Sequence, residues 1–504
     1  DADCAGRGTS TVCAVRFLEG APAPGPVDVE ALGAARVADG WRLACQAYVT
    51  TRCTVSLASA TDRGAMSLLT HGDAAPTAHG RRRGTGWGAA IDVGTTTVVC
   101  YLVDRSMARQ AGVAAFANPQ RRFGDDVIAR ITYAHEGPEQ LRRLQSVLVD
   151  AIDAGLAQLC DERGVRVDDL RAITVAGNPT MLHLLAGVDP WQLGVAPFEP
   201  AFRDTFSASS ASLGFARCRA DVEFLPLVAG HLGADAVAGI VALGLTRRSG
   251  VSLFIDLGTN GEIALVRDGD AVGCTCAAGP AFEGGRISSG MPALTGAIRR
   301  IEIDGGALAL DVIGGGEARG LCGSGLTDAV ALLLDAGAVS ASGRMATPGA
   351  LADAAPACVR DALRCGDAGA RVELAPGVAL TARDVREVQL AKAAVRTGID
   401  VLLGDARLAP EQVDDAYLAG AFGSSIRAES LLALGMLPAV LRGRIHPVGN
   451  VAGVGAQLAL EYEERIDEAR QLGRTMRHIE LMLRPDFEER FAANIAFPAP
   501  GGAS

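Results

Sequence analysis

Two short stretches of the sequence share one design, and this repeat constrains the fold more than any other feature. The stretches are "AIDVGTTTVVCYLV" at 90–103 and "FIDLGTNGEIALV" at 254–266. In each, an apolar strand ends at an aspartate, Asp92 or Asp256, and a Gly-Thr turn leads into a second apolar strand. We therefore expect two similar halves, each of which begins with a β-hairpin around a Gly-Thr turn.

Such a hairpin suits a phosphate group and its metal ion. Consecutive backbone N–H groups in a tight Gly turn form an anion-binding concavity, and threonine hydroxyls add donors. An aspartate at the strand end can hold Mg²⁺ beside the phosphates, directly or through water. Two such hairpins that face each other would hold a triphosphate from both sides. The alternative is a pair of ordinary Gly hairpins without a ligand.

Strands and helices alternate from about residue 87 onward, which predicts layered α/β domains. Amphipathic helices are expected at 137–164 and 386–406. The 504 residues exceed one ordinary core and indicate two or three domains. We place the first half at 87–245 and the second half at 246–504.

The first 86 residues lack this long alternation of strands and helices. Residues 1–60 form a small unit, and residues 61–86, with little periodicity, are expected to be a linker. The elements predicted in the small unit are strands at 11–20 and 51–58 and a helix at 27–40. The basic run Arg81, Arg82 and Arg83 is interpreted as a solvated part of the linker.

Charge and apolar runs argue against two classes of partner, and cysteine usage indicates the cellular compartment. The formal net charge of −11 argues against a nucleic acid or an anionic membrane as partner. No run of about 18 apolar residues is present, so no membrane span is expected. The twelve cysteines are scattered rather than spaced as a disulfide framework, which favours a reducing cytoplasm.

The paired hairpins resemble the phosphate loops of the actin, heat-shock chaperone and sugar kinase superfamily of ATPases, abbreviated ASKHA. "YLAGAFGSS" at 417–425 is similar to the adenosine motif of that superfamily. More specifically, the chain resembles the reductive activators of corrinoid proteins. The strings that carry this resemblance include "NPQRRFGDDVIARI" (118–131), "VAGNPTMLHLLAGVDP" (175–190), "FLPLVAGHLGADAVAGI" (224–240), "AAGPAFEGGRISSGM" (277–291), "GLCGSGLTDAVA" (320–331), "REVQLAKAAVRTGI" (386–399) and "GNVAGVGAQLAL" (449–460).

The resemblance implies an α/β fold of two RNase H-like halves and a site for ATP and Mg²⁺ between them. Glu262 and Glu283 are candidates to position the attacking water, while the alternative for Glu262 is a carboxylate on a strand face. Asn178 is either a residue of the cleft or a helix N-cap. The remaining implied site residues are Asp92, Gly94, Thr95, Thr96, Asp256, Gly258, Thr259, Asn260, Gly323, Ser324, Gly325, Gly420 and Gly423.

The resemblance also implies a truncated, β-grasp, plant-type ferredoxin-like domain at the N-terminus. The family holds a 2Fe-2S cluster with four thiolates, and Cys4, Cys13 and Cys45 match three of them. Ser10 stands at the fourth position, and a serine hydroxyl is far harder to deprotonate than a thiol with a pKa of about 8.5. We therefore expect a less stable cluster with an altered potential. The strand hairpin that opens the family's domain is missing, so a segment before Asp1 is expected.

The function implied is ATP-dependent reduction of a corrinoid protein from Co(II) to Co(I), with electrons passing from an external donor through the cluster. The resemblance implies a homodimer as well. The alternative is an ASKHA-fold ATPase or a small-molecule kinase without a redox role.

Overall fold

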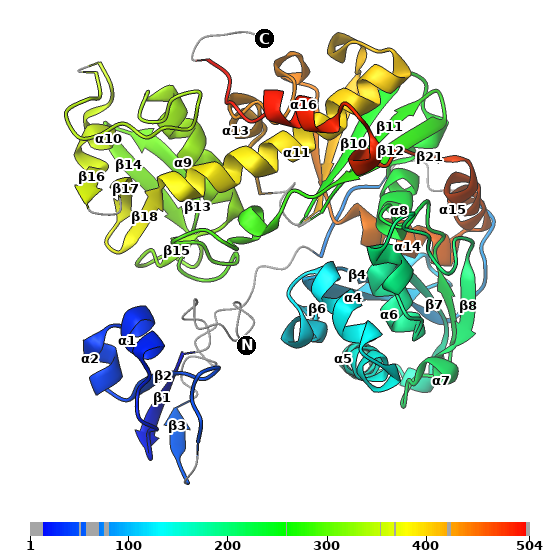
Figure 1. Cartoon of the computed structure of the whole chain (residues 1–504). Helices are drawn as coiled ribbons and strands as arrows, with labels where there is room; N and C mark the ends of the chain where they lie inside the picture. Colours follow the sequence, from blue (N-terminus) through cyan, green and yellow to red (C-terminus); the bar gives the residue numbers. More distant parts are fainter. Residues whose placement is uncertain are drawn as a thin grey trace.

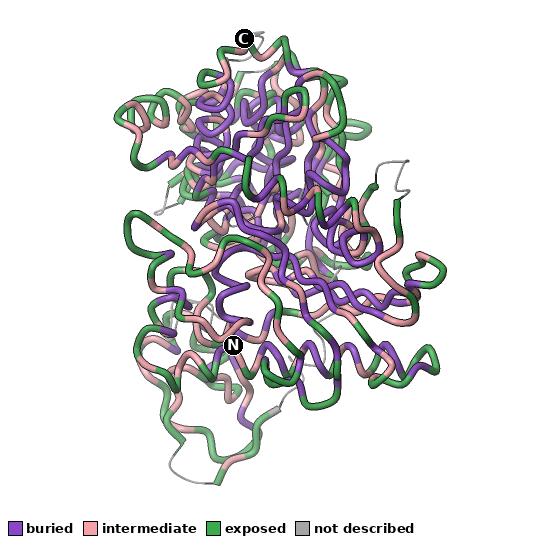
Figure 2. The backbone as a smooth tube through the Cα atoms, turned by 90° about the vertical axis from the view of Figure 1, so that its right-hand side faces the viewer, coloured by how far each residue is buried: buried purple, intermediate pink, exposed green. Residues whose placement is uncertain are grey.

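The computed structural model describes residues 14–49, 52–56, 70–74, 80–258, 260–352, 354–366, 369–420 and 425–499. Two six-stranded mixed sheets form the centre of the molecule (Figure 1). Buried residues are concentrated in these sheets and in the helices that cover them (Figure 2).

The first sheet has the strand order β6-β5-β4-β7-β9-β8. The β4-β5-β6 meander is antiparallel, β7 runs parallel to β4, and β9 runs parallel to β7. The strands are β4 (Trp87–Val93), β5 (Thr97–Asp104), β6 (Arg109–Ala117), β7 (Leu170–Gly177), β8 (Phe206–Ser209) and β9 (Asp221–Phe224). The helices of this half are α4 (Val127–His135), α5 (Pro138–Glu162), α6 (Pro179–Ala186), α7 (Ser210–Leu213) and α8 (Ala234–Leu243).

The second sheet repeats this plan, with the order β20-β19-β10-β11-β12-β21. Again an antiparallel meander, β10-β11-β12, comes first in the chain, and β19 and β20 add parallel strands on the other side of β10. The strands are β10 (Val251–Leu257), β11 (Gly261–Arg267), β12 (Asp270–Cys276), β19 (Asp415–Ala419), β20 (Ile445–Gly449) and β21 (Arg477–His478). The repeated order confirms the predicted α/β fold with two related halves.

A smaller lobe with its own core is inserted between β12 and β19. It contains two three-stranded sheets, β14-β13-β15 and β16-β17-β18, beside the helix α9 (Gly323–Asp335). The other elements are η5 (Pro280–Glu283), β13 (Ala297–Asp304), β14 (Ala307–Val312), β15 (Gly320–Leu321), α10 (Ala357–Ala362), β16 (Leu363–Gly366), β17 (Gly369–Ala375) and β18 (Val378–Thr381).

Two long helices follow the sequence prediction. Residues 137–164 contain α5, and residues 386–406 lie within α11 (Ala382–Ala406). The capping box of Thr381 and Asp384 begins α11, four residues before the quoted motif. Among the helices that the structure describes, none combines the length and the apolar character required to cross a bilayer.

The last part of the chain returns to the first half. The helix α14 (Val451–Glu461) directly follows β20 and packs against α8, β4 and β7. Glycines allow this close contact, because a Cβ atom at Gly455 would lie 2.0 Å from the carbonyl oxygen of Ala238. One at Gly453 would lie 2.5 Å from the ring of Tyr101. The remaining C-terminal helices are α13 (Ala428–Ala433), α15 (Glu463–Thr475) and α16 (Phe487–Ala493).

The N-terminal unit is a three-stranded antiparallel sheet with two short helices. Its strand order is β2-β1-β3. The predicted helix at 27–40 is wrong as one element, because Gly33 adopts φ 78° and separates two helices. The elements are β1 (Ala14–Glu19), α1 (Pro26–Leu32), α2 (Ala34–Ala38), β2 (Trp41–Leu43) and β3 (Thr54–Ser56).

The linker is attached to both halves of the chain, and the interpretation of the basic run as solvated is wrong for Arg82 and Arg83, whereas Arg81 is exposed. The Arg83 N–H donates to the Glu461 carbonyl at 2.9 Å, and the Arg83 guanidinium pairs with Glu223 at 2.8 Å. Arg82 stacks on Tyr462, the first residue after α14. Arg82 and Arg83 bind at the turn between α14 and α15 because this turn presents a backbone carbonyl group and the ring of Tyr462.

The tight contact between α8 and α14 yields a stability prediction. Changing Gly455→Ala places a methyl group against the backbone of α8, so we expect the midpoint of chemical denaturation to fall by the equivalent of about 1–3 kcal/mol. Gly404→Ala in α11 is the matched control, since a Cβ there meets nothing within 4 Å. We expect that change to raise the midpoint, because alanine favours helix by up to about 1 kcal/mol. Equal effects of the two variants would contradict the packing argument.

Candidate nucleotide site

The first hairpin turn is held from behind by buried polar side chains. Arg130, which has no exposed surface, donates to the Thr95 carbonyl at 2.7 Å, and Asn118 donates to the Gly94 carbonyl at 2.9 Å. The Gly94 N–H closes the turn onto the Thr97 carbonyl at 2.9 Å. In the described part of the chain, no hydrogen bond uses the N–H groups of Thr95 and Thr96. The turn therefore presents donors to an anion while its carbonyls are occupied.

Asn178 is a helix N-cap, as one of the two predicted alternatives has it, and it also contacts Thr95, while its role in the cleft stays a prediction. Its side-chain oxygen accepts from the Met181 N–H at 3.0 Å and so caps α6. Its side-chain amide donates to the Thr95 hydroxyl at 3.0 Å. The cap thus holds the side-chain amide of Asn178 beside the first hairpin turn, residues 94–96, which is called the phosphate turn below.

The second hairpin is described in part. Gly258 donates to the Asn260 carbonyl at 3.2 Å, while Thr259 lies outside the described residues. Asp256 and Glu262 are directly paired across β10 and β11, so their side chains share one face of the sheet. Gly420 follows β19 with φ 86°, and a Cβ atom there would lie 2.4 Å from an oxygen of Asp256. Gly423 also lies outside the described residues.

Four carboxyl groups from both halves influence one another here. Burial raises the pKa of Asp92 to about 7. A 2.8 Å hydrogen bond from Asn450 opposes this rise, whereas the negative charge of Asp235 adds to it. Desolvation also raises the pKa of Asp235, of Asp256 and of Glu262, and the charge of Asp235 raises it further in the last two. No basic side chain contributes to any of these shifts. The cluster therefore favours a bound cation.

The donor set suits hydrated Mg²⁺ rather than a closed protein cage. Among the residues that the structure describes, no three His, Cys, Asp or Glu side chains are placed to ligate one metal ion together. Mg²⁺ typically keeps several waters and takes one or two carboxylates together with substrate phosphates. Asp92 and Asp256, one from each hairpin, fit that pattern.

Glu283 joins the two halves at this site. It ends η5, and its carboxylate accepts a hydrogen bond from the Thr96 hydroxyl at 2.9 Å. Gly323, Ser324 and Gly325 begin α9 as predicted and pack tightly beside this element. A Cβ atom at Gly323 would lie 2.0 Å from the Phe282 carbonyl oxygen, so this glycine allows the close packing. A contact of these three residues with the nucleotide stays a prediction.

Sequence reasoning missed four residues of the site. Asn118, Arg130, Asp235 and Asn450 all lie in strings that carried the family resemblance, yet none was assigned a role. A usable signal existed for Asp235, which follows Gly233 and stands in the first turn of α8. A carboxylate in the first turn of a helix is common, but this one stands in a run of small and apolar residues that predicts a buried helix.

Only one of the predicted cluster ligands lies in the described part of the chain. Cys45 is half-buried in the turn after β2, whereas Cys4, Ser10 and Cys13 lie outside the described residues. Buried Asp28 accepts from the Leu43 N–H at 2.8 Å and so anchors the end of β2 near Cys45. The cluster stays a prediction.

Comparison with known proteins decides the family. The model of the RACo middle region matches residues 87–248, and the model of the C-terminal domain of RACo, described as the ASKHA domain, matches residues 250–502. The chain belongs to the RACo family.

Relatives of this family member include two curated proteins and one solved structure. It is 35% identical to the corrinoid activation enzyme RamQ of Eubacterium limosum, over 82% of this chain and 70% of the relative. It is 23% identical to the [Co(II) methylated amine-specific corrinoid protein] reductase of Methanosarcina barkeri, over 82% of this chain and 78% of the relative. A solved structure named a reductive activator for corrinoid, iron-sulfur protein aligns with TM-score 0.74 and 26% identity, covering 98% of this chain and 93% of the other.

The raised carboxyl pKa values predict a pH-dependent stability. A carboxyl group whose pKa is higher in the folded state binds more protons there, so stability falls as pH rises from about 4 through the folded pKa. Without Mg²⁺ and nucleotide, we expect the thermal midpoint to fall between about pH 5 and pH 8, because burial raises the pKa of Asp92 to about 7 and that of Asp256 to about 8. Asp256→Asn should flatten this decline, whereas Asp150→Asn, exposed on α5, should leave it unchanged. A midpoint that rises over this range would contradict the cluster.

Proposed function

We propose that this RACo family member is an ATP-dependent reductive activator that returns the cobalt of a corrinoid protein from Co(II) to Co(I). The observation that carries the proposal is the pair of facing hairpins with their uncompensated carboxyl groups, in a chain of the RACo family. The relatives' names supply the chemical class of the target, a corrinoid protein.

In the proposed site, Mg²⁺ supplies positive charge that neutralises the triphosphate and the carboxyl groups together. The N–H groups of the first turn and the hydroxyl of Thr95 face the phosphates. Asp92 and Asp256 hold the water shell of the metal ion, and metal binding keeps both ionised. Asp235, Glu262 and Glu283 are the candidates for orienting the attacking water. Gly420 lets the backbone lie against the nucleotide.

Cleft closure is the proposed source of coupling. The hydrogen bond between Thr96 and Glu283 spans the two halves directly at the phosphate turn. A nucleotide that binds one arrangement of the halves more tightly shifts the population toward it, and the size of the shift equals the difference in binding free energy. In this proposal the terminal phosphate, which ATP has and ADP lacks, is the group to which this contact responds.

The linker connects this site to the N-terminal unit. The His71 carbonyl accepts from the Asn450 N–H at 2.9 Å, and the Asp73 N–H donates to the Val448 carbonyl at 2.9 Å. Asn450 in turn donates its side-chain amide to Asp92 at 2.8 Å. One residue therefore contacts both the linker and a carboxylate of the proposed nucleotide site.

Electron transfer is proposed through a 2Fe-2S cluster held by Cys4, Cys13, Cys45 and Ser10. Bound there, a cluster would supply the one electron that reduces Co(II) to Co(I), and an external donor would return that electron. The family resemblance further supports a homodimer. Ser10 favours one second candidate, an ASKHA ATPase that changes its partner's conformation without carrying electrons.

The decisive experiment measures anaerobic Co(I) formation in a corrinoid protein by absorbance, with the full chain, a reductant, Mg²⁺ and ATP. We expect reduction to require ATP and to fall by about a hundredfold or more in Asp92→Asn and Asp256→Asn, because each change removes a negative charge that would hold the metal ion beside the phosphates. Asp150→Asn on the exposed face of α5 should behave as wild type.

The same preparation separates the two candidate functions. A reduced-cluster signal in electron paramagnetic resonance together with ATP-dependent Co(I) formation supports the electron carrier. ATP hydrolysis that responds to the corrinoid protein without any cluster signal supports the conformational ATPase. Hydrolysis that responds only to a small-molecule acceptor would overturn the proposal.

The linker contact yields a separate prediction. A Cβ atom at Gly72 would lie 2.5 Å from the backbone of Asn450, so Gly72→Ala should release the segment from β20. We expect ATP hydrolysis to persist while the number of cobalt centres reduced per ATP falls several-fold.

Asp73→Ala is the matched control for this change. The segment uses the backbone of Asp73, whose side chain is exposed, so the control keeps the contact. Unchanged yield per ATP in Gly72→Ala would show that the linker contact has no part in coupling.

A further inference from the structure

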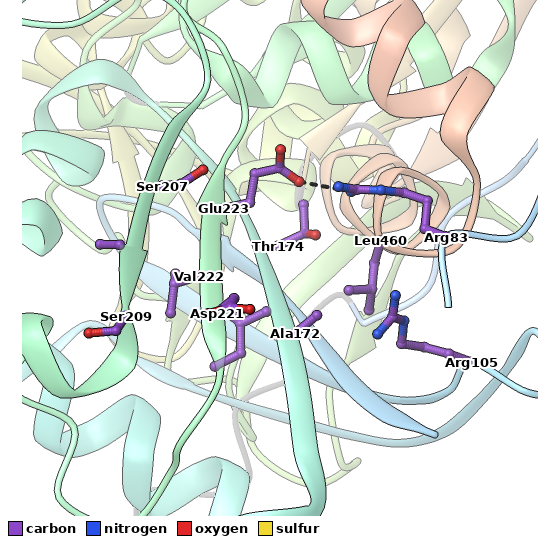
Figure 3. Close-up of a pocket in the computed structure, with 12 residues that line it drawn as sticks. Arg83, Arg105, Ala172, Thr174, Ser207, Ser209, Asp221, Val222, Glu223 and Leu460 are labelled. Carbon is purple, nitrogen blue, oxygen red and sulfur yellow. Dashed lines mark ion pairs between the residues drawn. The ribbon is translucent and has the colours of Figure 1, made fainter. Parts of the chain in front are cut away.

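The first half contains a second hollow, of about 550 Å³, away from the phosphate turn (Figure 3). Its floor is one face of the sheet at β7, β9 and β8, and its side wall comes from Arg83, Arg105 and Leu460. The lining residues of β7 end at Thr174 in the middle of the strand, whereas Asn178 and the phosphate turn lie beyond the end of that strand. The hollow is therefore distinct from the nucleotide site.

Arg105 is the unusual residue of this pocket. It is 8% exposed, and its Nε atom is buried without a hydrogen-bond partner. Among the described residues, no carboxylate forms an ion pair with its guanidinium. A buried cation without a partner carries a large desolvation cost, which an anionic ligand would offset.

The surroundings are shaped around this side chain. A Cβ atom at Gly84 would lie 2.6 Å from a terminal nitrogen of Arg105, and one at Gly88 would lie 2.7 Å from its Cδ atom. Two glycines from the end of the linker and the start of β4 thus leave the space that the arginine occupies. Any larger residue at either position would displace the guanidinium.

The neighbouring charges do not compensate Arg105. Glu223 is engaged by Arg83 and by Arg470, each at 2.8 Å. The Glu461 carboxyl group lies close enough to Arg105 to interact with it electrostatically, but among the described residues no ion pair joins the two. Asp221 lies at the exposed edge of the pocket. One guanidinium charge therefore stays available.

Hydroxyl groups complete the donor set. Thr174 is 1% exposed and lines the pocket, and Ser207 lies on the opposite side from the arginines (Figure 3). Ser209 is engaged by Ser212 through a hydrogen bond of 3.1 Å. A guanidinium and hydroxyl groups that line one pocket supply the donors that bind a carboxylate or a phosphate group.

We propose that this pocket binds a small molecule that carries one oxyanion, a carboxylate or a phosphate monoester. Arg105 binds the oxyanion, and Thr174 and Ser207 donate to it or to the polar body of the ligand. Among the described residues that line the pocket, only the Arg105 guanidinium forms no ion pair, and Asp221 repels additional negative charge, so a polyphosphate is disfavoured. The volume fits a metabolite-sized ligand. Because Arg83 ends the linker, a bound ligand contacts the linker and the sheet at once.

The test uses the full chain with Mg²⁺ and ADP present, so that the nucleotide site is filled. Propionate and inorganic phosphate are titrated separately at constant ionic strength, and hydrogen exchange is followed by mass spectrometry. We expect one of the two anions to slow exchange at 80–84, 172–174, 207–209 and 221–223. The anion that protects identifies the class of ligand.

Substitutions test whether the protection by an anion depends on the side chains proposed to bind it. Arg105→Met should weaken protection about tenfold or more, since a charge-assisted pair is lost. Ser207→Ala, at an exposed position, should weaken it several-fold and covers the case in which the arginine variant fails to fold. Arg109→Met, exposed on β6, should change nothing. Absence of protection by both anions, or protection that persists in Arg105→Met and in Ser207→Ala, would overturn the proposal. The readout does not depend on corrinoid reduction.

Discussion

Carboxyl groups placed together without a positive partner are the constraint around which this molecule is arranged. Separating Asp92, Asp256 and Glu262 from bulk water costs free energy, and their mutual repulsion adds to that cost. A fold retains such a cluster only where the surrounding structure is stable enough to enforce it. Here the two duplicated sheets supply that stability, and the cost is recovered when a cation and a phosphate chain enter. In the proposed function, ligand binding would therefore be coupled to closure of the halves.

The return of the chain to its first half makes this arrangement possible. Because α14 packs against β4 and α8, the residue that caps α14 is carried to the end of β4. That residue, Asn450, accepts from the Gly453 N–H at 2.9 Å and donates to Asp92. The glycine contacts between α8 and α14 thus have a consequence for the site, since a wider helix spacing would withdraw the amide from the carboxylate.

Local patterns in the sequence predicted the parts of the structure that local chemistry determines. The two hairpins, α5 and α11 follow from apolar periodicity and from the Gly-Thr turns, which need no distant partner. The role of Arg130 could not be predicted, because its hydrogen bond to Thr95 depends on packing between elements far apart in the chain. The same reason explains the docked arginines of the linker, whose partners lie hundreds of residues later. Gly33 was visible in the sequence, but its positive φ was not.

Two regions of the linker contact the same helix from opposite ends, and this bears on how an electron carrier would be controlled. His71 and Asp73 contact the residues just before α14, whereas Arg83 contacts its last turn through the Glu461 carbonyl. A displacement of α14 along its axis would therefore change both linker contacts together. Since Asn450 also contacts Asp92, occupation of the nucleotide site and occupation of the Arg105 pocket would act on one helix. Two ligands that favour the same position of that helix must favour each other's binding, because coupling between sites is reciprocal.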